Sequence, residues 1–221
     1  MTLTGVVGPQ TMGSLGTGVP GAVRLGQLND LVVTELHGKW YENNYRGNLY
    51  CGGMSVTALS ANTITLVAAT TPIIGVWNPT TSTANLVIAK AKLQIAVANA
   101  NAVAPGGFVW ATSTGNSALT LGLTPLNRKS LVAAGSQAKY FNISTALTGL
   151  TNNLVIQMAA GFGTLIAAQG ATATPIISGD TVEEFDGGLI VPPGGLLCLL
   201  NTVSTTTVSV ASMIMWEEVP L

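Results

Sequence analysis

Charged side chains are scarce in this chain of 221 residues, which has eight Lys and Arg and nine Asp and Glu. They make up 8% of the sequence, against a usual level of about 25%. Disordered chains are rich in charge and poor in apolar residues, so a hydrophobic fraction of 48% excludes disorder. A coiled coil is excluded because it needs charged positions beside its apolar seam. The formal net charge of −1 leaves few cations to meet phosphates, so we expect no nucleic-acid partner.

Long apolar runs are also missing, although the mean hydropathy is high at +0.49. A membrane-spanning helix needs roughly 20 mostly apolar residues in a row. Every uncharged stretch of this chain is interrupted by Asn, Gln, Pro or Gly. Residues 1–21 have no basic segment before an apolar block, so they do not have the pattern of a signal peptide. We therefore expect no membrane partner.

Histidine and cysteine are too few for a structural zinc site, which needs three or four ligands. The single histidine, His37, lies two residues from Glu35, but no nucleophile motif accompanies them, so we expect a structural or exposed side chain. Cys51 and Cys198 lie far apart and outside any C-x-x-C motif, which is typical of small buried apolar residues. Whether these two pair in a disulfide is left open by the sequence.

Carboxylates gather in two places that could carry chemistry. The first group consists of Asp180, Glu183, Glu184 and Asp186. These carboxylates could form a calcium site, but the segment lacks the Asp/Asn-Gly spacing of calcium ligands, so a solvated loop is the better interpretation. Glu217 and Glu218 are neighbours on a predicted strand and would point to opposite faces, so they cannot act together as a glycosidase acid and base.

Motifs for cofactor chemistry are equally weak. Residues 16–21 match G-x-G-x-x-G, but no strand precedes them and Pro20 fits such a turn poorly, so we interpret the match as chance. There is no Walker lysine motif and no nucleophile elbow. We expect no enzymatic activity, no cofactor and no metal ion.

Small and hydroxyl residues are abundant instead, with 26 Gly and 28 Thr. The dominant pattern is one of short strands separated by Gly, Pro and Asn turns. The clearest strand is 207–219, in which Val208, Val210, Ile214 and Trp216 share a face. Other candidate strands are 62–67, 71–77, 85–97, 108–112, 154–158, and the pair 188–191 and 196–200 joined by a turn at 192–195.

Residues 85–97 show the alternation of a half-solvated strand, with Lys90, Lys92 and Gln94 on one face and Ala89, Ala91, Leu93 and Ile95 on the other. No βαβ rhythm is visible. These patterns predict an all-β protein, an antiparallel β-sandwich or jelly roll. We expect one such domain over residues 23–221 after an extended N-terminal arm at 1–22. The spacing of apolar residues at 25–36 is compatible with either a helix or a strand.

Charge of the two signs is separated along the chain. All eight basic residues lie at or before Lys139, whereas every charged residue after it is acidic. These charges could pair within one subunit, or they could set a head-to-tail contact between subunits.

The segment 39–50 combines aromatic, amide and charged side chains. This is the composition of an interface hot spot or of a sugar-stacking platform. We predict an interface formed by Trp40, Tyr41, Tyr45 and Arg46. The alternative is a packed helix face, because Tyr41, Tyr45 and Leu49 follow at intervals of four residues.

Several short segments at turns and strand ends are distinctive: GKWYE at 38–42, YRGNL at 45–49, WNP at 77–79, NLV at 85–87, IVPPGG at 190–195 and WEEVP at 216–220. With these segments the chain resembles virion-associated β structural proteins of tailed bacteriophages. The resemblance implies a non-enzymatic component of the virion, with a jelly roll that trimerises and either decorates the capsid or belongs to the tail. It implies no particular functional residues.

The composition and the resemblance together lead to one expectation of function. We expect a closed homo-oligomer, a trimer, that stabilises the particle and contacts a major capsid or other virion protein partly through its N-terminal arm. A receptor- or carbohydrate-binding fibre head is the first alternative. An open fibrous assembly is the second, because a heterologous contact that does not close produces filaments.

Overall fold

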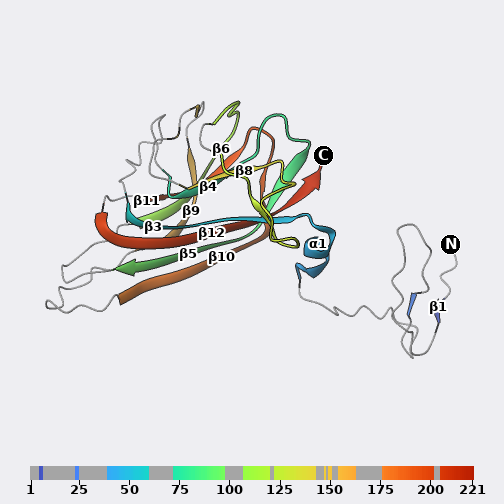
Figure 1. Ribbon diagram of the computed structural model, residues 1–221, viewed down its shortest axis with the longest axis horizontal. Coiled ribbons are helices and arrows are strands. Elements are labelled where there is room, and N and C mark those ends of the chain that lie inside the picture. The colour runs from blue at the N-terminus through green and yellow to red at the C-terminus, as the bar shows by residue number, and fades with distance from the viewer. Residues whose placement is uncertain are drawn as a thin grey trace. The chain divides into compact units, whose positions relative to one another are not determined.

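The computed structural model describes residues 5–6, 23–24, 39–59, 72–97, 107–119, 122–142, 147, 149–150, 154–162, 176–201 and 205–221 (Figure 1). The chain divides into two compact units, Met1–Glu42 and Asn43–Leu221. In the first, β1 (Gly5–Val6) pairs in parallel with β2 (Val23–Arg24). The predicted arm boundary after residue 22 stays a prediction, and residues 25–36 and 62–67 lie outside the described residues.

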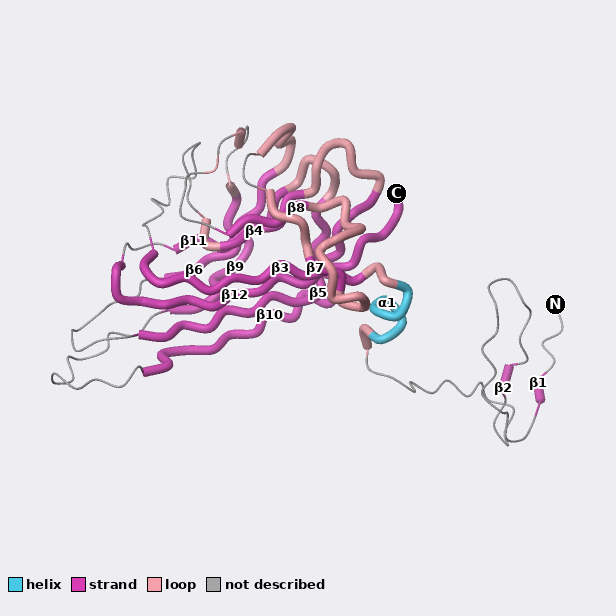
Figure 2. The backbone as a smooth tube through the Cα atoms, in the orientation of Figure 1, coloured by secondary structure: helices cyan, strands magenta, loops and turns pink. Residues whose placement is uncertain are grey.

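The second unit is built from two five-stranded antiparallel sheets packed against each other. One short helix, α1 (Tyr41–Arg46), spans the boundary between the two units along the chain. The first sheet has the order β10 (Ile176–Val191), β5 (Ala84–Val97), β12 (Thr205–Pro220), β3 (Leu49–Leu59) and β7 (Leu126–Asn127). The second has the order β8 (Lys139–Asn142), β4 (Ile74–Trp77), β11 (Leu196–Asn201), β6 (Gly107–Ser113) and β9 (Val155–Phe162). Figure 2 shows β3, β12, β5 and β10 side by side.

The strand pairs are nested along the chain. β3 pairs with β12, β4 with β11, β5 with β10, and β6 with β9, all antiparallel. Four nested pairs distributed over two sheets are the strand order of a jelly roll. β7 and β8 lie between β6 and β9 in sequence and extend the sheets beyond β3 and β4. The predicted all-β antiparallel sandwich is therefore confirmed.

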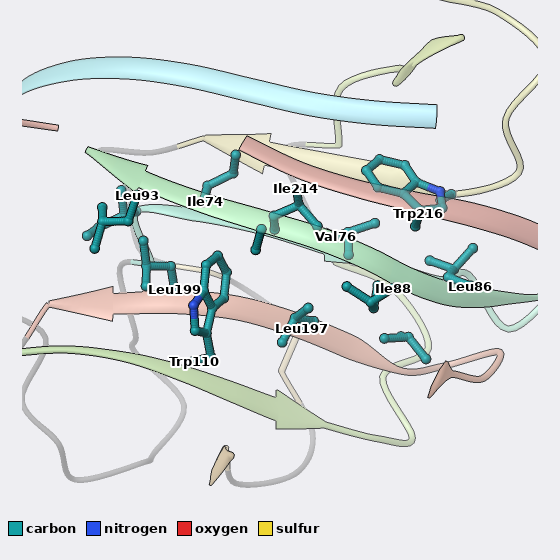
Figure 3. Packing of buried hydrophobic residues seen from close by; sticks show 14 of the residues in the cluster. Ile74, Val76, Leu86, Ile88, Leu93, Trp110, Leu197, Leu199, Ile214 and Trp216 are labelled. Carbon is teal, nitrogen blue, oxygen red and sulfur yellow. The ribbon is translucent and has the colours of Figure 1, made fainter. Parts of the chain in front are cut away.

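Apolar side chains from both sheets meet in the core between them (Figure 3). Ile214 and Trp216 of β12 face this core, as the sequence predicted, and Leu197, Leu199 and Trp110 come from the opposite sheet. A second cluster lies on the other face of β11, formed by Leu196, Cys198 and Leu200 with loop residues such as Leu147 and Leu154. All six residues of β11 are buried because both faces of its sheet are covered, which explains its unbroken apolar sequence.

The strand over 85–97 is confirmed, with one irregularity. Met215 lies opposite Lys90 but Trp216 lies opposite Ile88, so Ala89 is an extra residue in β5. This bulge shifts the alternation by one position. Leu86 and Ile88 before it and Ala91 and Leu93 after it are consequently all buried, whereas Lys90 and Lys92 are only partly so.

In the first unit β1 and β2 were not predicted, and in the second unit β3, β7, β8 and most of β10 were not. β3 was missed because Gly52 and Gly53 interrupt its apolar alternation. A Cβ on Gly52 would lie 2.6 Å from the ring of Tyr140, so this position accepts only glycine. Tyr140 is far from Gly52 in the sequence, so no local pattern predicts that this position needs a glycine.

Replacing Leu197 with Ala should lower the free energy of unfolding by about 2–5 kcal/mol, because Leu197 is fully buried between the sheets and the change leaves a cavity. Denaturant unfolding followed by tryptophan fluorescence measures this. The matched control is Leu123→Ala, an exposed leucine, which should cost less than about 0.5 kcal/mol. Equal losses in the two variants would contradict the core assignment.

Candidate interaction surface

Of the predicted interface residues, Tyr41, Tyr45 and Arg46 lie on the short helix α1, and Trp40 directly precedes it. Tyr45 is 61% exposed, Tyr41 and Arg46 are also exposed, and Trp40 is partly buried. Leu49, by contrast, is buried and belongs to β3. The packed helix face of Tyr41, Tyr45 and Leu49 is therefore wrong. Trp40 and Tyr41 belong to the first compact unit, and Tyr45 and Arg46 to the second.

Gly47 ends the helix. Its φ of 84° is in the left-handed region, its N–H donates to Asn44 O, and the N–H of Asn48 donates to Asn43 O. These two hydrogen bonds are those of a Schellman cap, which favours glycine at this position. The cap turns the chain directly into β3, so Tyr45 is held close to the edge of the first sheet.

The loop 127–132, which follows β7, lies against this helix end (Figure 2). The side chain of Asn127 organises it: Oδ1 accepts from the N–H groups of Lys129 and Ser130, and Nδ2 donates to Gly47 O at 2.7 Å. The N–H of Leu131 donates to Asn127 O. Lys129 Nζ lies 4.9 Å from the centre of the Tyr45 ring, a cation–π contact that joins loop and helix.

Leu131 is the most unusual residue of this loop. Its φ is 58°, a left-handed conformation that is rare for a large apolar residue, and its side chain is 68% exposed. This loop was not among the predicted interface residues. Asn127 followed by two cations and a serine is an Asx-turn signal that could have found it.

Glu217 and Glu218 point to opposite faces of β12, as predicted. Glu217 Oε2 accepts from Asn43 Nδ2 at 2.6 Å, and burial raises its pKa above the ordinary value while the nearby Arg46 opposes that shift. Glu218 is only 8% exposed and accepts from Ser136 Oγ at 2.5 Å and from the N–H of Gln137 and of Ala138. The carboxylate of Glu218 thus fastens the segment 136–138 to the centre of the sheet.

The acidic cluster of the sequence lies on β10, the edge strand of the first sheet. Glu184 makes an ion pair with Lys90 at 2.8 Å, so charges of the two sequence halves do pair within the subunit. Asp186 and Gly187 have positive φ and form a bulge opposite β5. In the part of the chain that the structure describes, no three His, Cys, Asp or Glu side chains gather to hold a metal ion. His37 lies outside the described residues.

Both cysteines are buried and free. Cys198 is in the second apolar cluster, where burial raises the pKa of its thiol. Cys51 on β3 has the guanidinium of Arg128 at 4.0 Å from its sulfur. The two thiols therefore behave as small core residues, in agreement with the interpretation from the sequence.

No protein family, curated protein or solved structure gives a significant match to this chain. Within the described ranges, no helix has the length and apolar character needed to cross a membrane.

Glu218→Gln should lower the free energy of unfolding by about 1.5–3 kcal/mol at neutral pH, because an amide nitrogen would replace one charged acceptor among several buried donors. Urea unfolding of the purified protein measures this. The residue's burial and its hydrogen bonds to 136–138 are the reason for the expectation. A loss below about 0.5 kcal/mol would show that this contact does not fasten the segment.

Glu217→Gln is the adjacent control and should leave stability at neutral pH unchanged or slightly higher. The folded state raises the pKa of Glu217, so it binds this proton more tightly than the unfolded state, and the wild type loses stability as pH rises through that pKa. Any advantage of the glutamine variant should therefore shrink as the pH falls towards 4.5, the ordinary value. Thermal unfolding across this pH range checks the sign.

Proposed function

We propose that this chain is a non-enzymatic structural protein of a virus particle, a capsid decoration or accessory protein or a tail component, that self-associates and stabilises the virion. The observation that carries the proposal is the jelly-roll strand order, an architecture used by viral capsid proteins as well as by lectin domains and cupins. Fold alone does not determine function. The proposal therefore also rests on the composition and on the phage-like segments of the sequence.

The surface of the second unit supports self-association. Large apolar side chains are exposed near its edges, including Tyr45, Leu131, Val132 and Ile190. Because only 8% of the residues are charged, electrostatic repulsion between copies of the chain is weak and does little to oppose their association. We place the chain in the virion as a trimer, with a major capsid or other virion protein as its partner and with neither nucleic acid nor membrane.

The mass of the recombinant protein in solution tests the oligomer. A stable species of about 68 kDa over a hundredfold concentration range, three times the chain mass of 22.5 kDa, is expected of a closed trimer. Light scattering after size-exclusion chromatography measures it. A monomer at every concentration would contradict self-association, and growth without limit would favour the open fibrous assembly.

Deleting residues 1–20 should leave a folded oligomer that no longer binds virus particles, if the arm attaches the protein to the lattice. Cosedimentation with particles stripped of the protein measures binding, and the solution mass of the truncated chain is the control. Unchanged binding would remove the role of the arm.

A receptor- or carbohydrate-binding fibre head remains the second candidate, because the tyrosine side chains of α1 are exposed. Lys129 lies over the Tyr45 ring, so a sugar would have to stack on the other face of that ring. Binding on a glycan array that is lost in Tyr45→Ala would favour this candidate, and silence on the array would count against it.

A further inference from the structure

Two surfaces of opposite charge lie at opposite edges of the first sheet, whose order runs from β10 to β7. We call the first the basic edge; it comprises Tyr45, Arg46, Arg128, Lys129, Leu131 and Val132, beside β7. We call the second the acidic edge; it comprises Val182, Glu183, Glu184, Asp186 and Ile190 of β10. Figure 2 shows β10 at one side of the sheet and β7 near α1.

The basic edge is held rigidly by contacts already described. Asn127 ties the loop to Gly47, the N–H of Arg128 donates to Leu49 O, and Lys129 lies on the Tyr45 ring. A left-handed leucine costs free energy, and such strain persists where the surroundings enforce it, often at a functional site. The loop therefore holds an exposed leucine together with two exposed cations, Arg128 and Lys129.

The acidic edge has the complementary composition. Val182 and Ile190 are 46% and 54% exposed, and Glu184 and Asp186 are exposed beside them. On the side away from β5, β10 pairs with no strand among the described residues. The bulge at Asp186 and Gly187 disrupts regular pairing there, which discourages another strand from adding to this edge. Contact through side chains is thereby favoured over contact through the backbone.

We propose that the partner of each edge is a second copy of this chain, with the basic edge of one copy docked head to tail on the acidic edge of the next. This rests on the self-association in the proposed function and deepens it by naming the surfaces. Opposite charges fix the register of the contact, and the exposed apolar side chains on both edges supply the area to be buried. A contact between two basic edges would bring like charges together and is disfavoured.

Such a contact is heterologous, because each copy uses two different surfaces. It produces a ring when the rotation between copies closes and a filament when it does not. The two edges are on opposite sides of one rigid sheet, so a single copy cannot satisfy its own edges. A contact of this direction joins one copy to the next, and a ring closed by such contacts needs no further interface.

Charge exchange tests the contact. Arg128→Glu with Lys129→Glu makes both edges of a copy acidic, and Glu183→Lys with Glu184→Lys makes both basic. Each pair of changes should raise the dissociation constant for self-association by about tenfold or more. The variant with all four changes has complementary edges again, and its dissociation constant should return to within about threefold of the wild type. Sedimentation velocity at one fixed ionic strength measures all four proteins.

A second variant avoids any effect of charge on folding. Leu131→Asn places at this position a residue that adopts a left-handed φ readily. The melting temperature of the variant should therefore not fall, but its dissociation constant for self-association should rise severalfold. The matched control is Leu221→Asn, which changes a more exposed leucine outside both edges and should leave assembly unchanged.

The outcomes separate this inference from the proposed function. A wild-type oligomer that none of the edge variants weakens, or that the four-change variant fails to restore, would overturn the head-to-tail contact while leaving self-association intact. An equal effect of Leu221→Asn and Leu131→Asn would overturn it too. A wild type that is monomeric throughout would overturn both the contact and the self-association on which it rests.

Discussion

Both five-stranded sheets are centred on the last two strands of the chain, and the sandwich depends on their placement. β12 lies between β3 and β5, and β11 lies between β4 and β6. Without these two strands, β3 is not joined to β5 in the first sheet and β4 is not joined to β6 in the second. With few charged residues, burial of apolar side chains such as Trp216 and Leu197 is the main source of stability. Long-range pairing of this kind is intrinsically slow to form.

The central strand β12 also positions part of the surface between β6 and β9. Glu218 near the end of β12 fixes the segment 136–138, and the same excursion between β6 and β9 carries β7, the loop 127–132 and β8. A buried carboxylate that accepts several hydrogen bonds holds its donors firmly. The loop with Leu131 is therefore fixed to the sandwich at the segment that follows it and, through Asn127 and Gly47, at the helix end.

The separation of charge along the sequence has two consequences in the fold. Part of it is used within the subunit, where Lys90 meets Glu184. In addition, the nested strand order places the basic loop after β7 at one sheet edge and the acidic strand β10, which carries Glu184, at the other. A structural role that relies on contact between copies is consistent with a chain whose polar surface is mostly neutral, since the few charges then serve to orient the contact.

The sequence by itself determined the β class, the alternation of the strand over 85–97, the buried face of β12 and the opposite directions of Glu217 and Glu218. These features depend on residues close together in the chain, where a period of two directly specifies a face. From the composition of residues 39–50 it also predicted an interface that includes Tyr45 and Arg46. Only the tertiary structure decided that Gly52 lies under the Tyr140 ring, that Ala89 is a bulge and that Leu131 is exposed in the loop whose Lys129 lies over the Tyr45 ring. Each of these is imposed by a partner that is distant in sequence, so no local pattern records it.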